Sequence, residues 1–328
     1  MTKIFICIAF MLTLCGCFDY NELNMQELVS GAGVDSTDDG VNVVVSCAST
    51  KSEEESEGAL YTAEGNGFFD AVRSVTGISD KKLYWGHAKC IVFGENAVSE
   101  IDGVLDAVLR ARDIYLDVTP VIARGASAKE IFKSKPQSGT DAVESITGAF
   151  GNESNSRRFR ALAVWEIMRL RGEKKPYILP VVTIEEEAPR VEGGAVIKDS
   201  KLAGYLSGEQ MLLLSLLTDE GDGGYLPTLS LSDKRQVSPE ILSNDLKIEH
   251  LGDGSIKIKQ KCVLSPAEVR GEVSGDEMRS AAKSFLETGY ESLISYAEKN
   301  GFEDILGEEK ISSVECDIRI SDILGGGK

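Results

Sequence analysis

The sequence switches repeatedly between segments with strand periodicity and segments with helix periodicity, and the two kinds do not alternate in a strict order. Residues 41–47 alternate as a half-buried strand does, whereas residues 276–299 place their apolar side chains on one helical face. A doubly wound parallel sheet requires regular strand–helix alternation. We therefore predict an α+β fold with mixed or antiparallel sheets and amphipathic helices, and the 328 residues are enough for more than one domain.

The remaining predicted elements follow from the same periodicities and from turn residues between them. Further strands are predicted around 59–63, 83–93, 117–123, 178–184 and 314–320, and further helices around 67–75, 97–109, 128–132, 162–170 and 207–217. Pro120 should place its strand at a sheet edge, because proline cannot donate to a ladder. The segment Glu185–Pro189 has the composition of a linker. It divides the chain into an N-terminal domain, residues 17–188, and a C-terminal domain, residues 189–328.

The charge of the chain excludes one class of partner. It has 53 Asp and Glu against 35 Lys and Arg, which gives a formal charge of -18. Cations cluster only as pairs, such as Arg157-Arg158 and Lys174-Lys175. Binding to nucleic acid requires a cationic face that displaces counterions from phosphate. We therefore expect no nucleic-acid partner.

The first residues have the features of a secretion signal, residues 1–16. One lysine precedes an apolar stretch from Ile4 to Leu14, which as a helix would span roughly half of the hydrocarbon thickness of a bilayer. The stretch ends in Leu14-Cys15-Gly16-Cys17, which resembles the lipobox of bacterial lipoproteins, with Cys15 as a departure. The resemblance implies that Cys17 becomes the first mature residue and carries diacylglycerol on its sulfur. The alternative is an ordinary signal peptide with incidental cysteines.

The other cysteines of the mature chain are too sparse for a disulfide framework. They are Cys47, Cys90, Cys262 and Cys316, and none belongs to a CxxC pair. Each lies in strand-like surroundings, so we predict small buried hydrophobic residues. A Cys47–Cys90 or a Cys262–Cys316 bridge remains open.

No combination of residues predicts a catalytic, cofactor or metal site. The two histidines are too few for a histidine-based triad or a zinc site. We predict that His87 is a core histidine, because it follows Trp85 in a buried strand, and that His250 is solvated. Gly31-Ala32-Gly33 could begin a dinucleotide loop, but the acidic pair Asp38-Asp39 would repel pyrophosphate. Turn glycines are the better interpretation.

Several short motifs follow one another in the order found in a known family. The opening Gly16-Cys17-Phe18-Asp19 is similar to a Gly-Cys-Trp-Asp start, and residues 29–35 are similar to an "SGIGID" segment. Residues 83–94 are similar to "FGHLK…IVIGE", residues 204–209 to "GxLSxxE", and residues 304–307 match a "DxxG" element. Phe18 replaces the usual Trp, and a Trp-containing segment near the C-terminus is missing. The chain resembles the C-subunit lipoproteins of bacterial spore germinant receptors, the Ger(x)C family, as far as about residue 307.

The resemblance implies a non-enzymatic subunit held by lipid at the outer face of the spore inner membrane. There it would assemble with integral-membrane receptor subunits, without a cofactor, and serve spore germination. The main rival is a lipid-anchored solute-binding protein of a transporter, which usually has repeated βα units in two similar lobes. An enzyme anchored outside the cell comes third.

Overall fold

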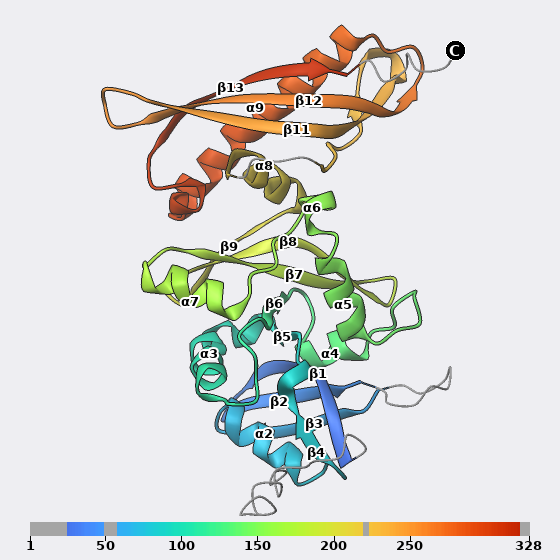
Figure 1. Ribbon diagram of the computed structural model, residues 1–328, viewed down its shortest axis with the longest axis vertical. Coiled ribbons are helices and arrows are strands. Elements are labelled where there is room, and N and C mark those ends of the chain that lie inside the picture. The colour runs from blue at the N-terminus through green and yellow to red at the C-terminus, as the bar shows by residue number, and fades with distance from the viewer. Residues whose placement is uncertain (1–24, 49–57, 219–222, 322–328) are drawn as a thin grey trace, which may run out of the picture.

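The computed structural model describes residues 25–48, 58–218 and 223–321, which form an elongated molecule with two sheets stacked along its long axis (Figure 1). The first sheet and its helices fill the lower and middle parts of the view, and the second sheet lies at the top with helix α9 (Gly275–Asn300) against it. Both sheets combine with amphipathic helices without regular alternation, which confirms the predicted α+β class.

The first sheet is mixed. In the described part of the chain it has nine strands in the order β3-β2-β1-β5-β6-β7-β8-β9, with β4 paired to β1 off this path. They are β1 (Gln26–Thr37), β2 (Gly40–Cys47), β3 (Leu60–Gly65), β4 (Lys82–Tyr84), β5 (Cys90–Phe93), β6 (Thr119–Ala123), β7 (Tyr177–Glu185), β8 (Ala188–Lys198) and β9 (Lys201–Leu206). The pairs β1–β4, β1–β5, β5–β6 and β6–β7 are parallel. The pairs β1–β2, β2–β3, β7–β8 and β8–β9 are antiparallel.

Helices cover both faces of this sheet, so its central strands are buried on both sides. Along β5, Ile91 and Phe93 face a core with helices α2 (Phe68–Thr76), α3 (Ile101–Arg110) and α7 (Val164–Gly172). Cys90 and Val92 face a second core with α4 (Ala128–Lys133) and α5 (Ala142–Phe150). Alternate residues of one strand thus enter different cores. Helix α3 follows a 3-10 turn, and Leu109 near its end is exposed, whereas Ile101, Val104, Leu105 and Val108 are buried.

The glycines at 31 and 33 lie within β1, so the prediction that they form a turn is wrong. The turn falls at Asp38 and Asp39. A Cβ atom at Gly33 would come within 2.6 Å of Val44 Cγ1 and 2.9 Å of Ala128 Cβ. Glycine is therefore required for close packing of α4 on the strand.

Pro120 lies in an interior strand, so the prediction of a sheet edge is also wrong. Strand β6 runs between β5 and β7, and all five of its residues are buried. The Thr119 amide donates to the Lys89 carbonyl on the β5 side at 2.9 Å, so the nitrogen of the next residue faces β7. The ladder to β7 begins only at Ile122. Because β7 is not yet paired with β6 at this position, the proline removes no hydrogen bond of the sheet.

The segment 83–93, predicted as one buried strand, is interrupted by a turn. Strand β4 ends at Tyr84, Trp85–His87 form a 3-10 turn, and β5 begins at Cys90. Trp85 is buried edge-to-face against Phe68, with the ring centroids 6.2 Å apart. The turn directs His87 outward against the ring of Tyr84. The prediction of a core histidine is therefore wrong.

The acidic segment predicted as a linker is a tight hairpin turn between β7 and β8. Glu185 pairs directly with Ala188, and the two residues between them, Glu186 and Glu187, have φ of 49° and 67°. Left-handed backbone at both positions is typical of a two-residue type I′ turn. The first sheet continues beyond this point to Leu206. The division into residues 17–188 and 189–328 stays a prediction about domains.

The second sheet consists of a long hairpin with a short strand on one side and a parallel strand on the other. Its strands are β10 (Leu229–Ser230), β11 (Gln236–His250), β12 (Ile256–Arg270) and β13 (Ile311–Ile320), in the order β10-β11-β12-β13. Helix α9 packs against β13 and begins at Ser274, whose hydroxyl accepts from the Glu277 amide while the Glu277 carboxylate accepts from the Ser274 amide. This capping box and the left-handed Gly301 delimit the helix within one residue of the predicted ends.

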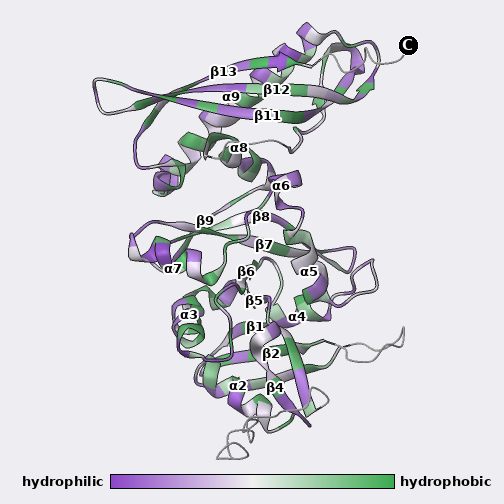
Figure 2. Ribbon diagram, viewed as in Figure 1, coloured by the Kyte–Doolittle hydropathy of each residue, from purple (hydrophilic) through white to green (hydrophobic). Residues whose placement is uncertain are grey.

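Helix α8 (Gly208–Thr218) connects the two sheets. It begins after Ser207, whose hydroxyl accepts from the Gln210 amide, and six apolar residues from Met211 to Leu217 are buried. Figure 2 shows this helix largely in the colour of apolar residues. A helix that is apolar on all sides must be covered on all sides. It is packed between β8 and α9.

Candidate functional site

The one residue that the sequence assigned to a site, Cys17, lies outside the described residues together with the predicted signal peptide. Among the helices that the structure describes, none is both long and apolar enough to cross a membrane. Candidate sites in the folded body therefore have to be found from cavities, charges and chemically reactive side chains.

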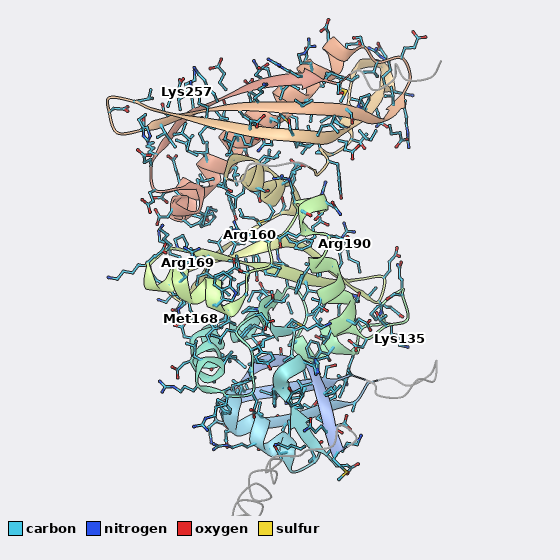
Figure 3. The ribbon with its side chains drawn as sticks, in the orientation of Figure 1. Lys135, Arg160, Met168, Arg169, Arg190 and Lys257 are labelled. Carbon is cyan, nitrogen blue, oxygen red and sulfur yellow. The ribbon has the colours of Figure 1, made fainter. Side chains whose placement is uncertain are left out.

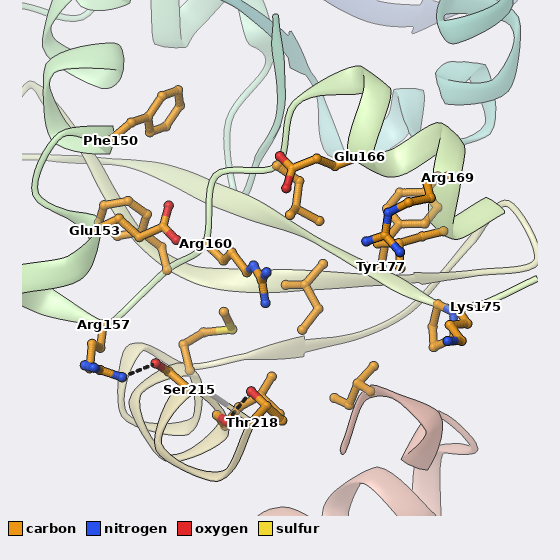
Figure 4. A pocket seen from close by; sticks show the side chains of 18 of the residues that line it. Phe150, Glu153, Arg157, Arg160, Glu166, Arg169, Lys175, Tyr177, Ser215 and Thr218 are labelled. Atoms are coloured by element: carbon orange, nitrogen blue, oxygen red, sulfur yellow. Dashed lines mark hydrogen bonds between the residues drawn. The ribbon is translucent and has the colours of Figure 1, made fainter. Parts of the chain in front are cut away.

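A groove of about 650 Å³ lies where the helices of the first sheet meet α8 (Figure 4). One wall comes from α5, the short helix α6 (Glu153–Ser156), α7 and the segment between α6 and α7. The other wall comes from α8 and the 3-10 turn Glu303–Leu306, and β7 contributes to the lining between them. Its apolar lining includes Phe150, Leu170, Ile178, Met211, Leu214 and Ile305.

The segment 157–163, which forms part of the first wall, has no regular secondary structure but is held at many points. Arg157 is buried in left-handed backbone at φ 54°, and its guanidinium donates to the Gly223 carbonyl at 2.9 Å and to Ser215 Oγ at 3.0 Å. Arg158 forms an ion pair with Glu192 at 3.0 Å. Further along the segment, two backbone amides donate to carboxylates. The Ala161 amide donates to Glu153 and the Ala163 amide donates to Glu166, both at 2.9 Å.

Arg160 projects from this segment into the middle of the groove (Figure 4). It lies at the height of β8 and β9 along the molecule, as Figure 3 shows. Its side chain is exposed, and in the described part of the chain no hydrogen bond or ion pair reaches its guanidinium. It is thus a cation available to a ligand.

The charges at the rim of the groove formed by Arg169, Glu173 and Lys175 are paired. Glu173 accepts from Lys175 at 3.1 Å and from Arg169 at 3.0 Å, and these bonds hold the pKa of its carboxyl below the ordinary value. Lys175 also contacts Glu308 at 2.8 Å, which with Glu173 raises the pKa of the lysine. These pairs are exposed and contribute little to stability. Their effect is to leave no unpaired carboxylate beside Arg160 on that rim.

The cysteines are buried and free in both parts of the molecule. The structure shows no bond between Cys47 and Cys90 or between Cys262 and Cys316. Burial raises the pKa of each of these thiols to about 12. The thiolate, which is the reactive form, is therefore absent at neutral pH. The prediction of small buried hydrophobic residues is confirmed.

Histidines and acidic side chains form no reactive cluster in residues 25–48, 58–218 and 223–321. His250 is exposed, as predicted, and its Nδ1 lies 3.1 Å from a Glu309 oxygen. In the same residues no three His, Cys, Asp or Glu side chains lie close enough to hold a metal ion. The groove instead has features suited to binding, namely an arginine, apolar side chains and paired charges at its rim.

The groove could not have been predicted from the sequence pattern. Its residues come from segments separated by up to about 150 positions, and the cation pairs Arg157-Arg158 and Lys174-Lys175 contribute one lining residue each. The available signal was the unusual run Arg157-Arg158-Phe159-Arg160 between two helices of an acidic chain.

The fold defines a two-sheet α+β protein with a groove beside helix α8, and comparisons with known proteins identify its family. A family model described as the spore germination protein N-terminal domain matches residues 19–184, slightly more than half of the 328 residues. The chain therefore belongs to this family of spore germination proteins. Its members are non-enzymatic C subunits of germinant receptors, the function indicated by the sequence motifs.

Individual proteins agree with this assignment. Spore germination protein B3 of Bacillus subtilis (strain 168) is 24% identical over 294 residues, which cover 84% of this chain and 76% of that protein. Spore germination protein KC of the same organism is 27% identical over 136 residues, 38% of this chain and 33% of that protein. The crystal structure of the GerBC protein has the same fold, with a TM-score of 0.55 and 16% identity over 89% of this chain and 97% of that one.

Proposed function

We propose that this chain is the lipid-anchored subunit of a nutrient germinant receptor and acts by holding integral-membrane receptor subunits in a complex. The observation that carries the proposal is the family match, which begins at residue 19, two residues after Cys17. The described part of the chain begins at residue 25, eight positions after Cys17, the residue proposed to carry the lipid. It would stand at the outer face of the spore inner membrane.

The lipid is needed because the acidic chain offers no electrostatic attraction to an anionic membrane. Removal of residues 1–16 deletes one lysine and changes the formal charge from -18 to -19, which anionic lipids repel. A single acyl chain binds membranes only marginally, whereas two or more hold a protein firmly. Diacylglycerol on Cys17 supplies two.

A solute-binding lipoprotein, the rival function, is not supported by the fold. Such proteins have two similar lobes of repeated βα units. Here the described residues form one nine-stranded mixed sheet and one four-stranded sheet of different strand order. We therefore retain the receptor subunit as the single proposal.

Metabolic labelling with a palmitate analogue tests the anchor. We expect the wild-type protein to carry label and to sediment with membranes. The Cys17→Ala protein should lack label and accumulate as precursor, because the thioether forms only at a thiol. Cys15→Ala is the matched control and should be labelled like the wild type. Label retained by the Cys17→Ala protein would contradict the assignment.

A further inference from the structure

The arginines of the segment between α6 and α7 differ in one respect that points to a ligand. Arg157 and Arg158 both have protein partners, Ser215 and Gly223 for the first and Glu192 for the second. Arg160, from the same segment, has none among residues 25–48, 58–218 and 223–321. In a chain with 53 acidic residues and 35 basic ones, a carboxylate partner is easily available to an arginine. This one is left free where it enters the groove.

The carboxylates that line the groove are already engaged. Glu153 and Glu166 accept from the amides of Ala161 and Ala163, Glu173 pairs with Arg169 and Lys175, and Asp304 pairs with Lys198 at 3.0 Å. If one of these carboxylates paired with Arg160 instead, it would lose a hydrogen bond or ion pair that stabilises the wall or the rim of the groove. Among residues 25–48, 58–218 and 223–321 no carboxylate therefore compensates the positive charge of Arg160, which these residues leave available to an anion.

The backbone that carries Arg160 is fixed before any ligand arrives. Phe159 and Leu162, on either side, are 5% exposed, and the Gly193 amide donates to the Arg158 carbonyl at 2.8 Å. The amide that follows Arg160 donates to Glu153. Binding would thus order little more than one side chain, which keeps the entropy cost of association low.

The surface around Arg160 sets the rest of the ligand's chemistry. The half-buried Phe150, Leu170 and Ile305 give the groove an apolar lining over the buried Met211 and Leu214, and its volume of about 650 Å³ is in the range of small-molecule sites. The planar guanidinium matches a carboxylate with two parallel hydrogen bonds. We propose that the groove binds a small organic carboxylate with an apolar body, and that Arg160 is its anion-binding residue.

This site goes beyond the proposed function and does not depend on it, since the binding would be observed with this chain alone. One charge-assisted contact in an open groove gives weak affinity, unlike the micromolar or tighter binding that a transporter's solute-binding protein requires. Weak affinity would let occupancy follow the ligand concentration.

The test uses the full-length lipoprotein in lipid nanodiscs, with 3-phenylpropionate as the probe and saturation-transfer NMR as the readout. We expect saturable binding of 3-phenylpropionate in about the millimolar range, and at least about tenfold weaker binding of the uncharged 3-phenylpropionamide. Arg160→Gln should weaken carboxylate binding at least about tenfold, because it removes the charged partner. Arg160→Lys should retain part of it.

The matched control is Arg112→Gln, which removes an exposed arginine outside the groove and should leave binding unchanged. Unfolding midpoints of all variants check that each is folded. Equal binding of 3-phenylpropionate by the wild type and Arg160→Gln would overturn the proposal, as would the absence of saturable binding. Inorganic phosphate is followed by its displacement of 3-phenylpropionate. Displacement at concentrations equal to those of unlabelled 3-phenylpropionate would overturn the requirement for an apolar body.

Discussion

The two sheets of this protein solve the problem of strand register in different ways. In the first sheet, central strands such as β5 send alternate residues into two apolar cores, so a slip of one residue would exchange the two sets. The second sheet has only one covered face, and its core contains a chain of polar side chains. Hydrogen bonds among these side chains add to the register that the buried apolar face of the sheet already specifies.

This polar chain links all the main elements of the second sheet. Asn244 on β11 donates to the Leu216 carbonyl of α8 at 3.0 Å and accepts from Gln260 on β12 at 2.6 Å. The Gln260 carbonyl oxygen accepts from the Tyr290 hydroxyl of α9 at 2.9 Å and from the Cys316 thiol of β13 at 3.4 Å. All four side chains are buried. A connected network of this kind rigidifies a core and specifies one packing, at the risk of a high cost when one member is lost.

The largest effect should come from filling the space at Gly33. Gly33→Val would place side-chain carbons where Val44 and Ala128 already lie, and we expect a loss of about 3 kcal/mol, concentrated in the first sheet. Alkylation in increasing urea, read by mass spectrometry, should then modify Cys47 and Cys90 before Cys262 and Cys316. Simultaneous modification of all four thiols would show that the two regions unfold as one unit.

The matched control is Gly103→Ala in α3. No atom lies within 4 Å of a Cβ there, so the substitution removes only the helix-forming disadvantage of glycine. We expect a gain of about 1 kcal/mol. An unchanged unfolding midpoint in Gly33→Val would contradict the close packing of α4 on β1.

The next effect concerns the polar chain of the second sheet. Gln260→Leu would leave the Tyr290 hydroxyl and the Asn244 carbonyl oxygen buried without this partner, at a cost of about 2–3 kcal/mol. Tyr290→Phe removes one donor and should cost about 1 kcal/mol. Urea unfolding gives both values, and the thiols of the second sheet should become reactive first. Equal losses for the two variants would contradict a connected network.

The smallest effect is the pH dependence of the α9 cap. Hydrogen bonds lower the pKa of the Glu277 carboxyl from 4.5 to about 2. The largest effect comes from the Ser274 amide, and smaller ones come from Arg235 and the Ser274 hydroxyl. The stabilisation is therefore fully present above about pH 4.5 and is lost as the pH falls toward 2. Glu277→Gln should be less stable than the wild type at pH 6, and the difference in melting temperature should shrink to nothing near pH 2. A constant difference would contradict the charged cap.

The features that could be predicted from the sequence are the local ones. Helix α9 was predicted within one residue at each end from its apolar face, and the structure shows that Ser274, Glu277 and Gly301 cap it there. The α+β class followed from periodicity alone. The family motifs are also contiguous in sequence, and the comparisons confirm the family.

The predictions that were wrong concern residues whose contacts are with segments distant in sequence. Pro120 is tolerated in an interior strand only because β7 joins the ladder two residues later. Glycine at position 33 is explained by Ala128, about 95 residues further on. The groove likewise requires α8 and the turn Glu303–Leu306 to meet the segment around Arg160. Periodicity and composition contain no information about such contacts.

The central claim, that this chain is an anchored receptor subunit, is tested most directly by germination of spores from which its gene is deleted. We predict that these spores fail to germinate with the nutrients sensed by their own receptor, and still germinate by routes that bypass receptors. Wild-type protein supplied in trans should restore the response, and Cys17→Ala protein should restore much less. A deletion strain that germinates normally with every nutrient to which the parent strain responds would contradict the account.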